Sequence, residues 1–273
     1  MVDGGMHIEV DACKRILVIS PHLDDGVLSV GGIIERAVAN GAEVIVATAF
    51  TADTPAGARI SPLALELHAL WDLGPNPFEQ RRAEDVASVT SLGARVLHGN
   101  LLDALYRADQ AGDPLYPTRQ SVFGAPSDRD RIGDALVELF DAWISEISPD
   151  LVLSPLGVGR HVDHVLTTNA VRRLAMVRAM NVALYEDLPY ATGLFPVTAP
   201  DSVEAALGRT QWQVTSPQVI SVDLPGKLAA IGAYASQIAD IFPNGLAFGS
   251  VLDTYMRRED GAFGERVWHT ATS

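Results

Sequence analysis

Short apolar runs alternate with longer amphipathic stretches over the first two thirds of the chain. Runs rich in β-branched residues predict buried strands at residues 14–20, 43–50, 94–99 and 149–154, with a fifth inside 181–189. Apolar residues at helical spacing predict helices at residues 25–40, 78–93, 128–148 and from about 165 to about 180. Strands that alternate with helices in this way predict an α/β fold, a mostly parallel sheet with helices on both faces.

The rest of the chain is less regular. Residues 51–77 and 103–127 are long and turn-rich, and we expect them to wall a pocket and to set specificity, because long loops in compact domains usually have a function. Residues 226–242 read as one helix and residues 261–268 as a turn-rich closing segment. We find no repeat and no linker, so we expect a single domain over residues 1–273.

Polar side chains follow the first and fourth predicted strands directly. The stretch "PHLDD" places His22, Asp24 and Asp25 after the first strand, and "GVGRHVDH" places His161 and His164 after the fourth. In open parallel sheets ligands bind at the carboxyl ends of the strands. The two clusters are therefore expected to meet at one edge of the sheet and to form a site.

The residue types in these clusters suit a metal ion. His22, Asp25 and His164 could supply two nitrogens and one oxygen, which suits catalytic zinc with a water in the fourth position and also suits ferrous iron. Asp24 would then stand beside the metal-bound water as its general base. The single cysteine, Cys13, excludes both an intrachain disulfide and a cysteine-rich zinc site.

The second cluster offers further groups. His161 could hydrogen-bond an oxyanion or protonate a leaving group, and Asp163 could hold His161 in one tautomer. Each cluster, taken alone, also has a purely structural explanation, since adjacent acids often cap a helix and two close histidines occur by chance. Their expected meeting at one sheet edge favours the functional interpretation.

Charge and composition narrow the class of partner. The net charge is −14 and only two residues are lysine, a balance that repels nucleic acid and anionic membranes. No apolar run is long enough to span a membrane, and the N-terminus lacks the pattern of a secretory signal. We therefore expect a cytoplasmic protein that acts on a small molecule, without nucleic acid or membrane insertion; whether it forms a homo-oligomer stays open.

Both motifs resemble those of the LmbE/PIG-L family of zinc-dependent N-deacetylases, whose first motif reads roughly PHPDDE. The stretch "RRAEDVASVTSLGARVLHGNLLDALYR" resembles the family's RxxE helix and following strand, and the likeness extends over about residues 14–270. The family fold is a Rossmann-like α/β sheet. Leu23 stands where the family usually has proline and Gly26 where it often has glutamate.

The resemblance implies roles for the motif residues. It implies that His22, Asp25 and His164 bind zinc, and that Asp24 is the general base and the acid that protonates the departing amine.

It further implies that His161 polarises the carbonyl oxyanion with support from Asp163, and that Arg81, the arginine of RxxE, touches the substrate. For Arg81 a solvated helix face with local ion pairs is the alternative.

Polar and aromatic residues near the same edge are candidate substrate contacts. They are Asp103, Tyr106 and Arg107 in the second irregular segment, and Tyr185, which ends the fifth predicted strand beside Glu186 and Asp187. A structural turn is the alternative explanation for the first three.

Together these observations predict a zinc-dependent carbon–nitrogen hydrolase. It would remove the N-acetyl group from an amino sugar or sugar conjugate by attack of a zinc-bound water. Two alternatives stay open: an amidase for a longer acyl group or a thiol conjugate, and a catalytically silent sugar-binding homologue.

Overall fold

The computed structural model describes residues 8–74, 76–196, 199–242 and 246–271. Its centre is a seven-stranded sheet in the order β3-β2-β1-β4-β5-β7-β6. The strands are β1 (Arg15–Ser20), β2 (Glu43–Thr48), β3 (Arg95–His98), β4 (Leu151–Pro155), β5 (Val182–Tyr185), β6 (Val214–Val222) and β7 (Phe263–Thr270). Strands β1 to β5 pair in parallel, whereas β7 runs antiparallel to both β5 and β6. The predicted mostly parallel sheet is confirmed.

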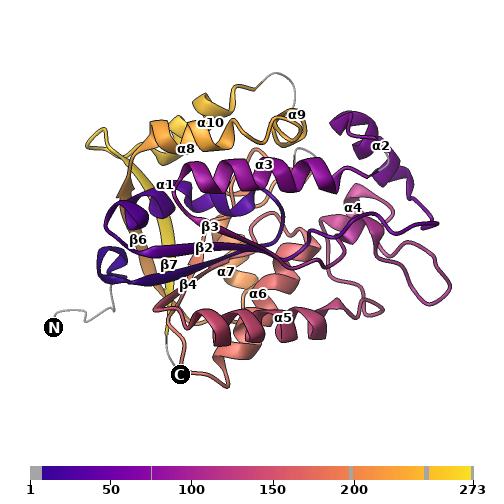
Figure 1. Ribbon diagram of the computed structural model, residues 1–273, viewed down its shortest axis with the longest axis horizontal. Helices are drawn as coiled ribbons and strands as arrows, with labels where there is room; N and C mark the ends of the chain where they lie inside the picture. Colours follow the sequence, from indigo (N-terminus) through magenta and orange to yellow (C-terminus); the bar gives the residue numbers. More distant parts are fainter. Residues whose placement is uncertain (1–7, 75, 197–198, 243–245, 272–273) are drawn as a thin grey trace.

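Helices cover both faces of the sheet, as predicted (Figure 1). The α-helices are α1 (Asp25–Ala39), α2 (Pro62–Trp71), α3 (Phe78–Ser91), α4 (Arg119–Val122), α5 (Ile132–Ile147), α6 (Val162–Ala175), α7 (Val203–Arg209), α8 (Leu224–Ile231), α9 (Ile238–Ile241) and α10 (Phe248–Met256). Short 3₁₀ turns are η1 (Val10–Ala12), η2 (Ala104–Tyr106) and η3 (Tyr190–Thr192). Helices α1, α3 and α8 lie on one side of the sheet in Figure 1, and α5 and α6 lie on the other.

The strand order creates a switch point between β1 and β4. From β1 the chain adds β2 and β3 on one side, and it then returns to add β4 and β5 on the other. The crevice outside the carboxyl ends of two such central strands is where α/β sheets bind ligands. Both polar clusters of the sequence follow these two strands.

The two antiparallel strands were not predicted, and the closing segment expected to be turn-rich is in fact most of β7. Gly264 accommodates a close approach, because a Cβ there would lie 2.4 Å from a Val219 side-chain atom on β6. Strand β6 contains Pro217, and its register shifts between Val214 and Pro217. Proline, glycine and charged residues on a two-stranded edge hide the alternation that marks a strand.

The single helix expected over residues 226–242 was also wrong, since α8 and α9 are separate. Glu84 on α3 accepts hydrogen bonds from the Ser236 backbone N–H (3.1 Å) and from the Ser236 hydroxyl (2.6 Å). A backbone N–H that donates to a side chain of another element is not available for the hydrogen bonds of a continuous helix. The segment 51–77 in turn contains α2, which begins with Ser61 accepting from the Ala64 N–H and with a proline in its first turn.

Helix α1 is kinked at Val30, where φ is −130° and ψ is 24°. Just after the kink, the Glu265 carboxylate on β7 accepts from the N–H groups of Gly32 (2.9 Å) and Ile33 (2.7 Å). Lys227 of α8 is fully buried and pairs with Glu265 at 2.6 Å. The last strand therefore fixes the course of the first helix.

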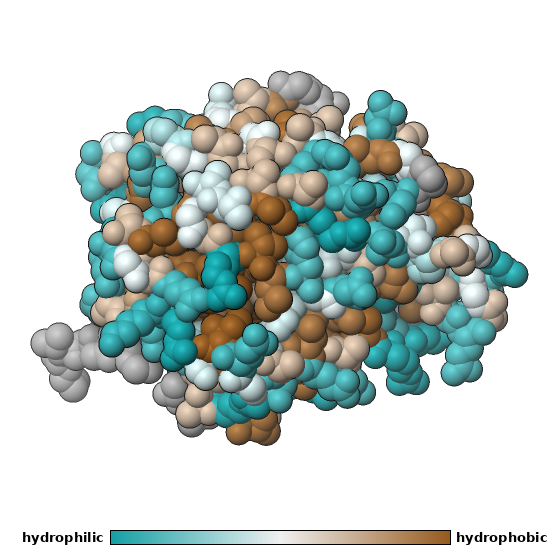
Figure 2. Space-filling view, in the orientation of Figure 1, coloured by the Kyte–Doolittle hydropathy of each residue, from teal (hydrophilic) through white to brown (hydrophobic). Residues whose placement is uncertain are grey.

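The surface in Figure 2 is polar around its rim, with apolar residues gathered near its middle. At the β3 edge of the sheet, the strand has only four residues, and Arg95 pairs with Glu43 of β2. A short, charged edge strand resists pairing with other chains. None of the helices in the described part of the chain combines the length and apolar character that a membrane-spanning segment requires.

Candidate metal centre and active site

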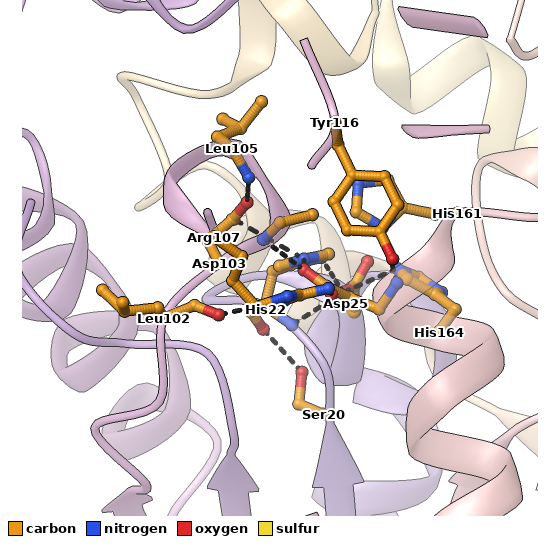
Figure 3. Close-up of polar contacts among 12 residues, drawn as sticks. Ser20, His22, Asp25, Leu102, Asp103, Leu105, Arg107, Tyr116, His161 and His164 are labelled. Atoms are coloured by element: carbon orange, nitrogen blue, oxygen red, sulfur yellow. Dashed lines mark hydrogen bonds and ion pairs between the residues drawn. The ribbon is translucent and has the colours of Figure 1, made fainter. Parts of the chain in front are cut away.

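A tight turn at the end of β1 presents His22 and Asp25. The Ser20 hydroxyl donates to the His22 carbonyl (2.7 Å) and accepts from the Gly26 N–H (2.9 Å), which fixes the turn. Asp25 Oδ2 accepts from the backbone N–H of His22 at 2.9 Å and lies 3.0 Å from its Nδ1 (Figure 3). Both side chains are nearly buried.

Helix α6 brings His164 to the same carboxylate oxygen. His164 Nε2 lies 3.1 Å from Asp25 Oδ2, yet this buried nitrogen is not aligned for a hydrogen bond to any of the described residues. One oxygen thus lies between a nitrogen of His22 and an otherwise unpartnered nitrogen of His164. A third ring is close, since ligand atoms of His22, His161 and His164 lie within 4.8 Å of one another. This donor set of nitrogen and carboxylate oxygen suits zinc or ferrous iron.

Each of these two histidines also contacts a carboxylate through its other ring nitrogen. His22 Nε2 lies 3.1 Å from Asp163 Oδ2, and His164 Nδ1 lies 2.7 Å from Asp187 Oδ1. The sequence predicts Asp187, at the end of the fifth strand, as a residue that lines the pocket and not as a partner of a ligand histidine. Its position at the carboxyl edge of the sheet was the one available signal.

The carboxylates favour positive charge at the two imidazoles. Burial opposes protonation of His22, but its contacts with Asp163 and Asp25 outweigh burial and hold its pKa well above the usual value. His164 is likewise buried, yet Asp25 and Asp187 raise its pKa to about 9. Burial acts to raise the pKa of Asp25, but His164 and His22 hold it well below the ordinary value. A field that attracts protons to this cluster attracts a divalent cation for the same reason.

Asp24 faces a different environment from Asp25. Burial and the adjacent charge of Asp25 raise the pKa of Asp24 to about 7. Its nearest cation is Arg81, whose Nη2 is 3.6 Å from Asp24 Oδ2. The Arg81 guanidinium is itself held over the rings of Trp71 (4.8 Å) and Phe78 (5.3 Å). The structure thus places Arg81 beside the predicted base, and its contact with substrate stays a prediction.

His161 forms the N-cap of α6. Its Nδ1 accepts from the Asp163 backbone N–H at 3.2 Å, so the neutral ring carries its proton on Nε2. Burial and the neighbouring His22 hold the pKa of His161 well below the ordinary value, which keeps the ring neutral. The Asp163 carboxylate, expected to support His161, contacts His22 instead.

Asp103 and Arg107 lie on the other side of His22 (Figure 3). Asp103 Oδ1 accepts from the Leu105 N–H at 2.9 Å, and its Oδ2 is 3.6 Å from His22 Nε2. Arg107 is buried and pairs with Asp163 Oδ1 at 2.6 Å and with Asp130 Oδ2 at 2.9 Å. Because the charge of Arg107 is neutralised by two carboxylates of the protein, its position fits a structural role better than the predicted substrate contact.

The hydroxyl groups of the two tyrosines predicted to contact substrate are both within hydrogen-bond distance of other groups of the protein. The Tyr106 hydroxyl lies 2.6 Å from His68 Nε2 on α2. Tyr185 is fully buried, and its hydroxyl donates to the Ile19 carbonyl at 2.9 Å. Tyr185 therefore offers no surface to a ligand. Its place at the end of a strand suggested otherwise, but its side chain points into the core.

The two long segments share a second hydrophobic cluster with residues that flank the site. Its buried members are Leu23, Leu63, Ala64, Leu67, Trp71, Phe78, Ala104, Leu105, Tyr106, Leu115, Tyr116, Val122 and Val162. Leu23 adjoins His22 and Val162 adjoins His161, so the segments 51–77 and 103–127 are anchored beside the clusters, as expected of pocket walls. Leu23, which stands where the family usually has proline, is fully buried in this second hydrophobic cluster.

The chain matches a known protein family over the region that contains these site residues. Residues 17–175, more than half of the chain, match the family described as PIG-L, GlcNAc-PI de-N-acetylase. The chain belongs to the PIG-L family. The matched region contains most of β1, the whole of β4 and both histidine–aspartate motifs, so it covers the candidate site.

Characterised relatives of this PIG-L protein are deacetylases of N-acetylated sugars. A 2'-N-acetylparomamine deacetylase of Streptomyces fradiae is 29% identical over 230 residues, covering 83% of this chain and 74% of the relative. A 1D-myo-inositol 2-acetamido-2-deoxy-alpha-D-glucopyranoside deacetylase of Mycolicibacterium smegmatis is 29% identical over 255 residues, covering 86% and 83%. Homologues of this chain thus hydrolyse amides on amino sugars.

Solved structures of deacetylases have the same fold as this chain. A teicoplanin deacetylase in its zinc-inhibited form superposes with a TM-score of 0.81 at 30% identity, covering 95% of this chain and 98% of that one. The A40926 pseudoaglycone deacetylase gives a TM-score of 0.76 at 32% identity, with the same coverage. The architecture described above is that of deacetylases over nearly its whole length.

Proposed function

We propose that this protein is a metal-dependent hydrolase that removes the N-acetyl group from an N-acetylated amino sugar or sugar conjugate. The observation that carries the proposal is the meeting of His22, Asp25 and His164, with Asp24 beside them, at the switch point between β1 and β4. The substrate class follows from the relatives, which act on N-acetylated sugars.

His22, Asp25 and His164 would hold the metal, with zinc as the first candidate and ferrous iron as the second. Asp25 Oδ2 lies 3.0 Å from His22 Nδ1 and 3.1 Å from His164 Nε2, and the unpartnered Nε2 of His164 fits a ligand better than a hydrogen-bond donor. When bound, the cation would lower the pKa of a coordinated water and polarise the acetamide carbonyl.

Asp24 would serve as the base. It lies in the same turn, between His22 and Asp25, and its carboxylate contacts Arg81 and neither proposed ligand histidine, so it is available to the attacking water. It would accept one proton from that water and deliver it to the nitrogen as the carbon–nitrogen bond breaks. The products are acetate and the amino sugar in its ammonium form, so both protons of the added water end on the amine nitrogen.

His161 would stabilise the developing oxyanion. Its Nδ1 is engaged by the backbone, so its Nε2–H is free to donate. A neutral donor fixed at a helix N-terminus needs no rearrangement when charge develops on the substrate oxygen.

Arg81 and Asp103 are the substrate contacts that the geometry still supports, because both lie against the base or the ligands. The walls formed by residues 51–77 and 103–127 would select the remainder of the sugar.

The test combines metal content with acetate release. Protein purified without chelator would be analysed by elemental mass spectrometry and assayed on N-acetylglucosamine, 2'-N-acetylparomamine and the inositol-linked acetamido sugar. We expect about one zinc or iron per chain and acetate release from at least one substrate. Asp24→Asn should keep the metal and lose roughly 10²–10⁴-fold in kcat, whereas the matched Asp25→Asn should lose the metal.

The outcomes separate the alternatives. Turnover of longer N-acyl sugars without turnover of acetyl sugars would replace the deacetylase by an amidase. Sugar binding without turnover by the metal-loaded protein would indicate a silent homologue. Absence of metal uptake by the wild-type protein would overturn the proposal.

A further inference from the structure

We infer that Asp163 and Asp187 are positioning residues that fix opposite ring tautomers of His22 and His164, with Arg107 locking Asp163 in place. The inference rests on the proposed function, because it concerns the residues proposed to hold the metal. It assigns Asp163 and Arg107 to the ligand His22 rather than to His161 or to the substrate.

On the α6 side, the geometry is set by Asp187 at the end of β5. Its Oδ1 is 2.7 Å from His164 Nδ1, and its Oδ2 accepts from the backbone N–H groups of Gly157 (2.8 Å) and Val158 (2.9 Å). The carboxylate is therefore immobilised and requires a donor at Nδ1 of His164. With the proton on Nδ1, the lone pair of Nε2 faces Asp25 and the metal position.

On the β1 side, the relation between the two ring nitrogens is reversed. His22 Nε2 is 3.1 Å from Asp163 Oδ2, and that oxygen also accepts from the Ala104 N–H at 3.0 Å. A carboxylate oxygen accepts only, so Nε2 of His22 carries the proton. Nδ1 of His22 faces the proposed ligand Asp25 at 3.0 Å, so it is the ring nitrogen that would give up its proton to bind a cation.

Arg107 holds the other oxygen of Asp163. Its Nη2 forms an ion pair with Asp163 Oδ1 at 2.6 Å that is not aligned as a hydrogen bond. Its Nε donates to Asp130 (2.9 Å) and its Nη1 donates to the Leu102 carbonyl (3.0 Å). Asp163 is fully buried, as is nearly all of Arg107. A buried carboxylate paired with a buried guanidinium stays ionised and fixed in orientation. Arg107 thus acts on the metal site through two intermediates, Asp163 and His22.

The chain of contacts has a directly observable consequence. In the metal-loaded protein, His22 should be protonated at Nε2 and His164 at Nδ1. Histidines labelled with ¹⁵N give distinct signals for the two tautomers, and His22→Ala and His164→Ala assign them. This measurement needs no substituted carboxylate, so it is independent of any folding defect.

Substitutions test the energetic role. Asp163→Asn and Asp187→Asn should each weaken zinc binding roughly 10–100-fold, the usual effect of losing an acceptor behind a ligand histidine. Zinc affinity would be measured by competition with a chromophoric chelator. Asp85→Asn is the matched control, because buried Asp85 pairs with His98 Nε2 at 2.8 Å and touches neither ligand. It should leave zinc affinity within about threefold of wild type.

Arg107→Gln should weaken zinc binding in the wild-type background and add little to Asp163→Asn, because both changes break the same chain of contacts. Wild-type zinc affinity in folded Asp163→Asn and Asp187→Asn, or the same tautomer for both ligand histidines, would overturn the inference. Either result leaves zinc binding and turnover by the wild-type protein intact. Failure of the proposed function would instead appear as no zinc uptake by the wild-type protein.

Discussion

At the scale of single residues, the adjacent carboxyl groups of Asp24 and Asp25 have opposite pKa shifts because they face different groups. Asp25 faces two imidazoles, and its pKa stays well below the ordinary value although burial acts to raise it. Asp24 faces Arg81 at 3.6 Å, and burial together with the charge of Asp25 raises the pKa of Asp24 to about 7. Neighbouring acids with diverging environments are a common way to divide roles in an active site. The division supports the proposal that Asp25 binds the metal and Asp24 transfers protons.

Replacing His161 by alanine tests the oxyanion role. Loss of one preorganised donor should lower kcat roughly 10²–10³-fold, with little change in KM, because the interaction exists mainly in the transition state. Steady-state kinetics on an acetylated amino sugar would measure both constants. The metal content of the variant is the control and should equal that of the wild type. A ligand atom of His161 lies within 4.8 Å of ligand atoms of His22 and His164, so loss of metal from the variant would instead identify His161 as a metal ligand and contradict the oxyanion role.

The candidate site could be predicted from the sequence at the level of residue type and sheet edge. "PHLDD" and "HVDH" end predicted parallel strands, so their meeting followed from the fold class. The partners within the cluster could not be predicted. Asp163 is two residues from His161, yet its carboxylate contacts His22, because Arg107 and the Ala104 N–H hold it there. Such contacts depend on loops whose course the sequence pattern does not specify.

At the scale of elements, α1 carries the site at one end and is held by β6 and β7 at its kink. Lys227 and Glu265 are buried there, and Glu265 binds the N–H groups of Gly32 and Ile33. The helix itself was predicted from its apolar spacing, but the kink was not. Glu265, which binds the N–H groups beside the kink, is more than two hundred residues away on a strand that the pattern did not reveal.

Gly32→Ala tests how closely α1 must approach β6. An added Cβ would lie 2.6 Å from the Val222 Cβ, a backbone-anchored atom that cannot rotate away. The variant should lose about 1–3 kcal/mol of unfolding free energy, as in other overpacked cores. Urea denaturation followed by circular dichroism would measure the loss.

Gly133→Ala is the control for helix propensity, since Gly133 also lies in a helix and nothing is within 4 Å of its Cβ position. It should leave stability unchanged or raise it by up to about 1 kcal/mol. Equal stability of Gly32→Ala and the wild type would mean that α1 can shift away from β6 without cost.

At the scale of the whole molecule, the ligands join two segments that are far apart in the chain. His22 and Asp25 follow β1, and His164 lies on α6 after β4, so a cation held by these proposed ligands would bridge both sides of the switch point. The same region anchors the long segments through Leu23 and Val162. Metal binding should therefore be coupled to global folding and not only to local order.

A ligand that binds only the folded state stabilises it by about 2.7 kcal/mol at a free concentration one hundred times its Kd. For a domain of this size that corresponds to an increase in unfolding temperature of roughly 5 °C. Differential scanning calorimetry of chelator-treated protein with and without zinc should show this increase for the wild type. Asp24→Asn should show it equally, because the base is not a ligand, whereas His22→Ala and His164→Ala should lose it. An increase that persists in both histidine variants would place the stabilising metal elsewhere, since zinc held through other groups would not depend on the two nitrogens that face Asp25.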